Sequence, residues 1–139
     1  NETIQTDLTH GWRGDYNNGA LVRVDPVVNF NWGGGSPGPG IASDMFGVRW
    51  TAWLRLPRNA SYTFYLTADH WAVLWLDGAP VTIGVAQTLV STQAYAAQLE
   101  FSEGGGLGYI TLEYSAPGVP RQLLPPSLVE PPHDPIQTG

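Results

Sequence analysis

The chain has 139 residues, of which 42% are hydrophobic and 13% are charged. A chain of this length folds as one compact domain rather than two, and its apolar content excludes extensive disorder. Twelve acidic residues against six arginines give a net charge of −6, which disfavours nucleic acid and anionic membrane surfaces as partners. The sequence has no cysteine and no stretch of about 18 apolar residues, so we expect no disulfide, no thiolate metal site and no membrane insertion.

Alternating apolar and polar residues predict short β-strands along the chain. The first two expected strands are 12–16 and 21–24. In residues 46–56, one parity reads Phe, Val, Trp, Ala, Leu, Leu and the other reads Gly, Arg, Thr, Trp, Arg. This period of two is typical of a half-buried strand whose polar parity faces solvent. Residues 62–68 repeat the alternation and predict another strand.

The second half of the chain continues the pattern. Residues 71–76, Trp-Ala-Val-Leu-Trp-Leu, are an unbroken apolar run that indicates a strand covered on both faces. Asp77-Gly78 follows as a two-residue hairpin signal, with 80–83 as the expected return strand. Residues 95–101 and 109–114 complete the set.

Glycine- and proline-rich segments separate these strands and predict turns. Eight or more short strands with such connections indicate an antiparallel sandwich or barrel. We expect a lead-in at residues 1–10, one domain at 11–129, and a proline-rich tail or linker at 130–139.

Five of the six tryptophans divide into two groups. Trp32, Trp50 and Trp75 lie on parities that predict burial in the core. Trp53 and Trp71 do not fit that pattern. An exposed indole stacks well on a pyranose ring, so these two are candidates for a sugar platform, and burial under a loop or at a contact is the alternative.

A set of motifs occurs in fixed order and covers nearly the whole expected domain. The motifs are Gly11-Trp12-Arg13-Gly14-Asp15-Tyr16, Asp25-Pro26, Phe30-Asn31-Trp32, Gly35-Ser36-Pro37, Leu74-Trp75-Leu76-Asp77-Gly78 and Leu112-Glu113-Tyr114-Ser115-Ala116-Pro117-Gly118. Together they resemble the fourteen-kilodalton domain family named for anthrax protective antigen. The resemblance implies an all-β, antiparallel two-sheet β-sandwich or flattened barrel.

That resemblance also sets expectations about function. The family occurs as a module in glycosidases, adhesins, toxins and surface signalling proteins, and glycan binding is its commonest suggested role. We therefore expect a non-catalytic carbohydrate-binding or adhesion module of a larger surface or secreted protein, located outside the cell or at its surface. The alternative is a structural or protein-interaction domain that contacts neighbouring domains and takes no small ligand.

In the adhesin branch of the family, two adjacent aspartates joined by a cis peptide bond hold a calcium ion that contacts sugar hydroxyls. The matching stretch here is Ala68-Asp69-His70-Trp71, in which only Asp69 supplies a carboxylate. Calcium takes six to eight oxygen ligands, so His70 is a poor substitute. We expect a trans bond and little calcium binding at Asp69, and we expect no other cofactor.

The resemblance places the site at one end of the sandwich, where residues 69–71 meet the 102–108 loop. Asp69 and Glu103 are expected to accept hydrogen bonds from sugar hydroxyls. His70 is expected to donate or accept, and Trp71 to stack on the ring. Binding residues are often found on loops held by a rigid scaffold.

The sequence contains little that points to catalysis or to covalent modification. The chain has no Gly-x-Ser-x-Gly elbow, and its histidines are far apart in sequence, so we expect no enzyme. A carboxylate pair for glycoside hydrolysis, such as Asp69 with Glu103, stays open. Asn59-Ala60-Ser61 is a glycosylation sequon in an expected turn, and its use is conditional on a eukaryotic secreted origin.

Overall fold

The structure is a computed structural model that describes residues 9–104 and 108–132. Strands make up most of the described chain, with one short 3₁₀ helix near its end. In chain order the elements are β1 (Trp12–Tyr16), β2 (Leu21–Asp25), β3 (Asn29–Gly33), β4 (Phe46–Arg55), β5 (Ala60–Ala68), β6 (Trp71–Leu76), β7 (Ala79–Pro80), β8 (Gln87–Leu89), β9 (Ala94–Glu103), β10 (Gly108–Ala116), β11 (Val119–Leu123), η1 (Pro126–Leu128) and β12 (Val129–Glu130).

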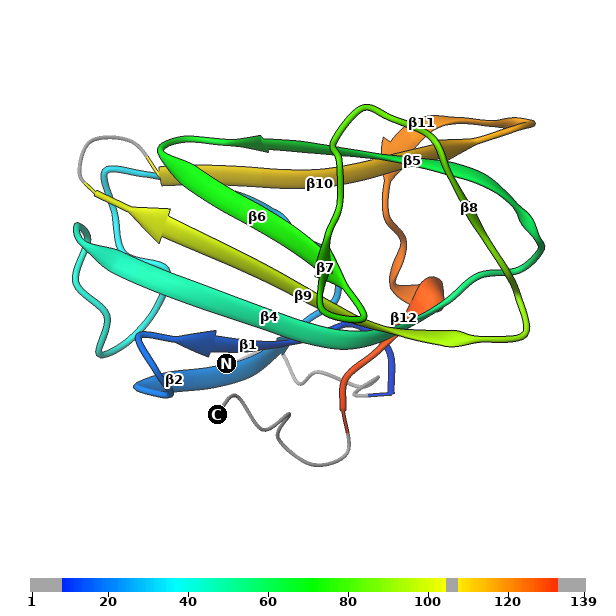
Figure 1. The fold of residues 1–139 in the computed structure, drawn as a ribbon. Helices are drawn as coiled ribbons and strands as arrows, with labels where there is room; N and C mark the ends of the chain where they lie inside the picture. The colour runs from blue at the N-terminus through cyan, green and yellow to red at the C-terminus, as the bar shows by residue number, and fades with distance from the viewer. Residues whose placement is uncertain (1–8, 105–107, 133–139) are drawn as a thin grey trace.

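The strands form two antiparallel sheets that pack face to face (Figure 1). One sheet has the order β2-β1-β4-β9-β6-β7, with β12 added alongside β4. The other has the order β11-β10-β5-β8, with β3 alongside β10. The described strands do not close into a barrel, so the all-β sandwich predicted from the sequence is confirmed.

The core lies between the sheets, and β4 shows how the alternation builds it. Phe46, Val48 and Trp50 are buried at successive even positions, whereas Gly47 and Arg49 between them are only partly covered. This confirms the prediction that the even-numbered side chains of β4 face the core. Thr51 is an exception, since it is buried although its parity points outward.

The prediction that both faces of residues 71–76 are covered is wrong. On β6, Leu74 and Leu76 are buried in the core, while Trp71 is exposed and Trp75 is only partly covered. A strand turns successive side chains to opposite faces, so the leucines and the tryptophans cannot share one side. The expectation that Trp75 belongs to the core is therefore also wrong, whereas Trp50 is fully buried and Trp32 is half-buried.

The predicted hairpin after β6 is present with a shorter return strand than expected. Asp77 and Gly78 have φ values of 50° and 80°, the two positive values of a type I′ turn. Of the expected return strand 80–83, only Pro80 lies within β7, which pairs with β6 through Leu76–Ala79 and Trp75–Pro80. The amide of Val81 makes one further bond to the Leu74 carbonyl before the chain turns away.

The strands that the sequence did not predict are β3, β8, β11 and β12. Each is short and pairs along only one side. Pro120 lies within β11, a position that proline tolerates only at the edge of a sheet. β8, β11 and β12 have no period-two pattern of their own and β3 alternates over only five residues, so neighbouring strands hold these segments extended.

A buried carboxylate ties the β1–β2 edge to the core. Asp25 accepts hydrogen bonds from the Tyr16 hydroxyl at 2.6 Å, from Trp50 Nε1 at 2.9 Å and from Arg23 Nε at 2.8 Å. Burial raises the pKa of the Tyr16 hydroxyl well above its usual range. A Cβ at Gly14 would lie 2.8 Å from Asp25 Oδ2, so glycine is needed there for space.

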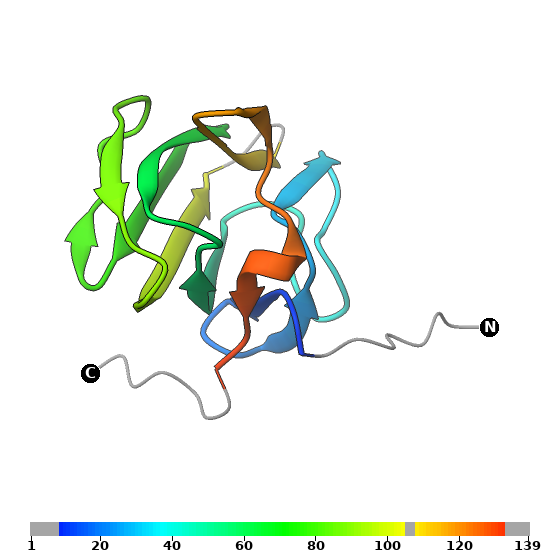
Figure 2. The same ribbon diagram turned by 90° about the vertical axis from the view of Figure 1, so that its right-hand side faces the viewer.

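The two ends of the sandwich differ. The ends of β3, β5 and β9 and the starts of β4, β6 and β10 lie at one end, at the left of Figure 1. Figure 2, viewed from the opposite end, shows η1 and β12 close to the viewer. There the Gly11 amide donates to the Val129 carbonyl at 2.9 Å, so the two limits of the predicted domain 11–129 meet. Most of the predicted lead-in and tail lies outside the described residues.

Candidate functional site

The two loops that the sequence assigned to the site do meet at one end of the sandwich. The Asp69 amide donates to the Tyr109 carbonyl at 3.0 Å, which fixes the β5–β6 connection against the start of β10. His70 has a positive φ of 79°. Its imidazole packs so closely against Gly104, at the end of β9, that a Cβ on Gly104 would collide with the ring. Residues 105–107 of the expected loop lie outside the described residues.

Glu103 lies beneath the surface rather than on it. Its side chain is 1% exposed, and neither carboxylate oxygen has a hydrogen-bond partner among the residues described. A Cβ on Gly108 would lie 3.4 Å from Oε2, so the glycine leaves room for the carboxylate. In this conformation Glu103 therefore does not reach the surface and cannot make the expected contact with a sugar.

The residues at this end do not fit a calcium ion. The Asp69–His70 peptide bond is trans, as the sequence predicted. Across residues 9–104 and 108–132, no group of three or more His, Cys, Asp or Glu side chains gathers at one point. Calcium requires six to eight oxygen ligands, which Asp69 beside an imidazole does not supply.

Millimolar calcium should leave the melting temperature of the protein unchanged within about one degree, because a ligand stabilises a fold only when it exceeds its dissociation constant. Thermal unfolding in calcium and in EDTA measures this. The matched variant is Glu103→Gln, which keeps the shape and removes the charge. A rise of several degrees that EDTA reverses and Glu103→Gln abolishes would contradict the prediction and assign the unpartnered carboxylate to a cation.

A hollow of about 500 Å³ lies on the outer face of the larger sheet, close to this end. Of the site residues expected from the sequence, only Trp71 lines it, while Asp69, His70 and Glu103 do not. Trp71 is 46% exposed, so much of its indole is available to a ligand. The structure therefore separates Trp71 from its sequence neighbours and combines it with a different set of side chains.

Strand register explains which residues share this surface. Trp71 on β6 is paired with Ser102 on β9, and Ser102 is paired with Gly47 on β4. Because paired residues project to the same side of a sheet, these three form one row across the strands. Gly47 has no side chain and Ser102 has a short one, so the row is low in its middle and bounded by the Trp71 indole.

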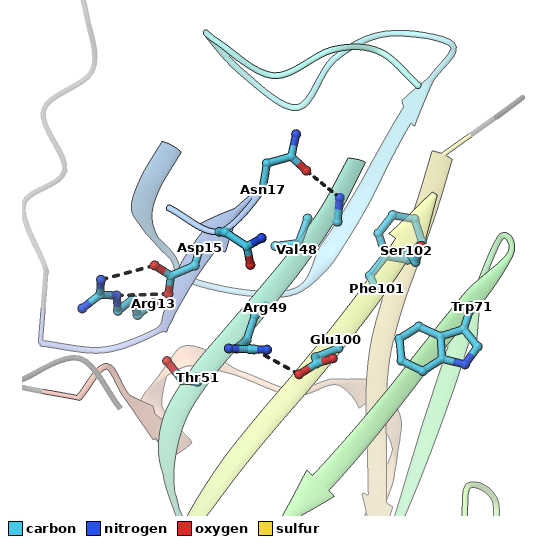
Figure 3. Close-up of a pocket in the computed structure, with 12 residues that line it drawn as sticks. Arg13, Asp15, Asn17, Val48, Arg49, Thr51, Trp71, Glu100, Phe101 and Ser102 are labelled. Carbon is cyan, nitrogen blue, oxygen red and sulfur yellow. Dashed lines mark hydrogen bonds and ion pairs between the residues drawn. The ribbon is translucent and has the colours of Figure 1, made fainter. Parts of the chain in front are cut away.

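The next row carries charge. Glu100 on β9 is paired with Arg49 on β4, which is paired with Asp15 on β1. Arg49 Nε donates to Glu100 Oε2 at 3.0 Å, and Arg13 Nε donates to Asp15 Oδ2 at 3.1 Å. Figure 3 shows the Arg49–Glu100 pair between Trp71 on one side and Arg13 with Asp15 on the other. These pairs hold their polar atoms in fixed positions at the surface.

The β1–β2 turn closes the far side of the hollow. Asn17 and Asn18 both have positive φ and line it. The Asn17 side-chain oxygen accepts a hydrogen bond from the Gly47 amide at 2.8 Å, and the Asn17 amide donates to the Gly47 carbonyl at the same distance. The turn is thus anchored to β4, and the hollow is built on rigid backbone.

Sequence reasoning missed most of these residues, although a signal for them exists. Arg49 and Glu100 lie on the polar parities of β4 and β9, and Asp15 lies on that of β1. Each parity predicts exposure, but strand order alone places the three side by side.

Asn59, the conditional glycosylation site, lies exposed in the turn between β4 and β5. Its side-chain oxygen accepts hydrogen bonds from the Ser91 amide at 2.8 Å and from the Ser91 hydroxyl at 3.2 Å. Modification of this residue stays a prediction.

The fold and the loop end described above define a two-sheet β-sandwich module of a known type. The PA14 domain model matches residues 9–88, which is more than half of the chain. The chain therefore belongs to the PA14 domain family, as the motifs predicted.

Three relatives show the range of proteins that carry similar domains. Anti-sigma-I factor RsgI3 of Acetivibrio thermocellus is 37% identical over 82 residues, which are 55% of this chain and 13% of that protein. A solved anti-sigma factor domain-containing protein from Clostridium clariflavum superposes with a TM-score of 0.81 at 30% identity, over 94% of this chain and 49% of that one. A PA14 sugar-binding domain from an RTX adhesin has a TM-score of 0.73 at 14% identity, over 89% and 99%.

This chain thus spans about half of the Clostridium clariflavum protein and a much smaller part of RsgI3. The third likeness shows the fold alone. Nowhere in residues 9–104 or 108–132 does the structure have a helix of the length and apolarity needed to cross a bilayer.

Proposed function

We propose that this domain is a non-catalytic carbohydrate-binding module and that the hollow beside Trp71 is its binding site. The observation that carries the proposal is the half-exposed indole of Trp71 at the border of a preformed polar hollow. Sugar rings present apolar faces and polar edges, and an aromatic platform beside fixed hydrogen-bonding groups meets both.

The side chains around Trp71 supply the polar contacts. Glu100 and Asp15 accept hydrogen bonds, Arg49 donates them, and Asn18 does both. All lie on strands or on a turn anchored to a strand, so little ordering energy is lost when a ligand binds. Asp69 and His70 at the neighbouring loop end stay proposed contacts at the rim. Glu103 is not part of the proposed binding site, because both of its carboxylate oxygens are buried.

The relatives support the class of ligand. One structural neighbour is described as a sugar-binding domain of an adhesin, and another is an epithelial adhesin domain from Candida glabrata in complex with Galβ1-3GlcNAc. Both share the sandwich at low identity, so they support the proposal by fold. An extracellular or cell-surface location belongs to the same proposal.

The likeness to anti-sigma factors also supports a proposal about the larger protein to which this domain would belong. Since this chain matches only a fraction of those proteins, we propose that it is the ligand-recognising part of a longer surface or secreted regulator. The alternative is a module that contacts protein domains and takes no sugar.

The test is titration of ¹⁵N-labelled protein with neutral sugars, namely glucose, galactose, xylose, cellobiose, maltose and lactose. At least one should bind with a dissociation constant on the order of millimolar, which is typical of a small exposed site. The amide shifts should cluster on the residues around Trp71. Trp71→Ala should abolish binding while the rest of the spectrum stays folded.

The matched control is Tyr109→Ala, which removes an aromatic ring with 36% exposure from the other sheet and should leave binding unchanged. A second variant, Asp69→Asn, tests the rim and should weaken binding only slightly. If no sugar shifts any amide at millimolar concentrations, the carbohydrate proposal is wrong and the protein-interaction role replaces it. Shifts confined to residues around Asp69 would move the site to the loop end.

A further inference from the structure

A second hollow, of about 270 Å³, lies on the same outer face and is lined by Trp75, Gly78 and Gln98 together with Ala96 and Ala97. Trp75 is four residues beyond Trp71 on β6, so both indoles project from the same side of the strand. With a rise of about 3.3 Å per residue, their backbones are about 13 Å apart. This spacing exceeds the reach of a single sugar ring.

The two hollows are connected by two parallel stripes of opposite character. Along β6, the outward residues are Trp71, Val73 and Trp75, which are all apolar. Along β9, their register partners are Ser102, Glu100 and Gln98, which are all polar. Gln98 Nε2 donates to Glu100 Oε2 at 2.6 Å, so the polar stripe is continuous from one hollow to the other.

This arrangement matches one kind of ligand. A saccharide chain that lies along β6 can place ring faces on the two indoles and hydroxyl edges against β9. A protein partner usually requires a contiguous apolar centre, whereas here each outward apolar side chain of β6 is paired with a hydroxyl, a carboxylate or an amide on β9.

The charges on this face also restrict the ligand. Each arginine that projects from it is paired with a carboxylate, so these pairs leave no net positive charge on the face to balance an acidic sugar. The pairs are Arg13–Asp15, Arg49–Glu100 and Arg55–Glu130. Together with the net charge of −6, this pairing disfavours uronic acids and sulfated sugars.

We infer that Trp75 forms a second subsite and that the β6–β9 stripe binds a neutral oligosaccharide long enough to cover both tryptophans. The inference rests on the proposed function and extends it from a single sugar to a chain. Binding should therefore strengthen with chain length, because a second stacked ring adds contact without a second loss of translational freedom.

The experiment is calorimetric titration with disaccharide and hexasaccharide pairs, namely cellobiose with cellohexaose, xylobiose with xylohexaose, and maltose with maltohexaose. In the series that binds, the hexasaccharide should bind at least about tenfold more tightly than the disaccharide. Trp75→Ala should remove that gain and leave the disaccharide constant unchanged. Trp75→Phe should restore part of the gain, because it keeps an aromatic platform.

Each other outcome overturns a defined part of the inference. Equal affinity for disaccharide and hexasaccharide in the wild-type protein excludes a second subsite. A length gain that survives in Trp75→Ala places that subsite elsewhere. Hexagalacturonate, titrated in parallel, tests the charge of the ligand, and tighter binding of it than of every neutral hexasaccharide overturns the neutral ligand class. If none of these disaccharides or hexasaccharides binds although a sugar binds in the amide-shift titration, the extension to a chain fails and the proposed function stands; if no sugar binds in either experiment, both fail.

Discussion

Replacing Asp25 by alanine should lower the free energy of unfolding by about 3 to 5 kcal/mol, because it leaves two buried hydrogen-bond donors unsatisfied at about 1 to 3 kcal/mol each and removes the partner of Arg23. The Asp25 carboxylate is 4% exposed and accepts bonds from Tyr16, Trp50 and Arg23. Without it, the Tyr16 hydroxyl and the Trp50 indole N–H lose their acceptor inside the core. Urea denaturation followed by tryptophan fluorescence measures the change.

The matched control is Glu113→Ala, which breaks an ion pair of similar length on the surface. Arg121 Nε lies 2.8 Å from Glu113 Oε1, and the arginine side chain is 51% exposed. Solvent screens such a pair, so the loss should be at most about 1 kcal/mol. Similar losses for the two variants would show that Asp25 does not organise the core in the way its contacts indicate.

The second large effect concerns the tryptophans. Trp50→Ala should cost about 3 to 5 kcal/mol, because Trp50 is fully buried and its removal leaves a cavity. Phe30 stacks on it with ring centroids 5.9 Å apart, and Tyr16 meets it edge-on at 6.2 Å. Both contacts disappear with the indole.

Trp75→Ala should cost much less, and Trp53→Ala should be similar to it, since both indoles lie on the outer face of the sheet. Denaturation of the three variants under one set of conditions measures the ranking. A loss at Trp75 as large as that at Trp50 would show that β6 presents its tryptophans to the core. The sequence pattern predicted that larger loss, so this comparison separates the two assignments of β6.

The buried face was predicted correctly for β4 and wrongly for β6 because the two strands differ in their pattern of polar residues. In β4, polar residues occupy one parity, so the period of two specifies which side is buried. In β6, both parities are apolar, so the pattern identifies a strand but does not show which of its faces is buried. Only the packing of Leu74 and Leu76 against the other sheet decides it, because buried leucines leave the indoles on the outside.

The arrangement of the loops at the Asp69 end of the sandwich, unlike the direction in which β6 turns its side chains, could be predicted from the family motifs. Family motifs placed Asp69, His70 and Trp71 in one connection, and the contact of His70 with Gly104 confirms that the two loops meet. Glu103 is the last residue of β9 and continues the parity of Leu99 and Phe101, which face the core, so the strand pattern gave a signal for its burial even though carboxylates are ordinarily solvated. Its depth depends on how Gly108 and Phe46 pack around it.

The sequence by itself determined the sandwich, most of its long strands and the type I′ hairpin, because period two and turn chemistry act between residues that are near in the chain. The hollow and its stripes were decided by tertiary structure alone. They require β1, β4, β9 and β6 to lie side by side, and those strands are separated by tens of residues. Asp15, Arg49, Glu100 and Trp71 share one surface only because antiparallel pairing sets their register.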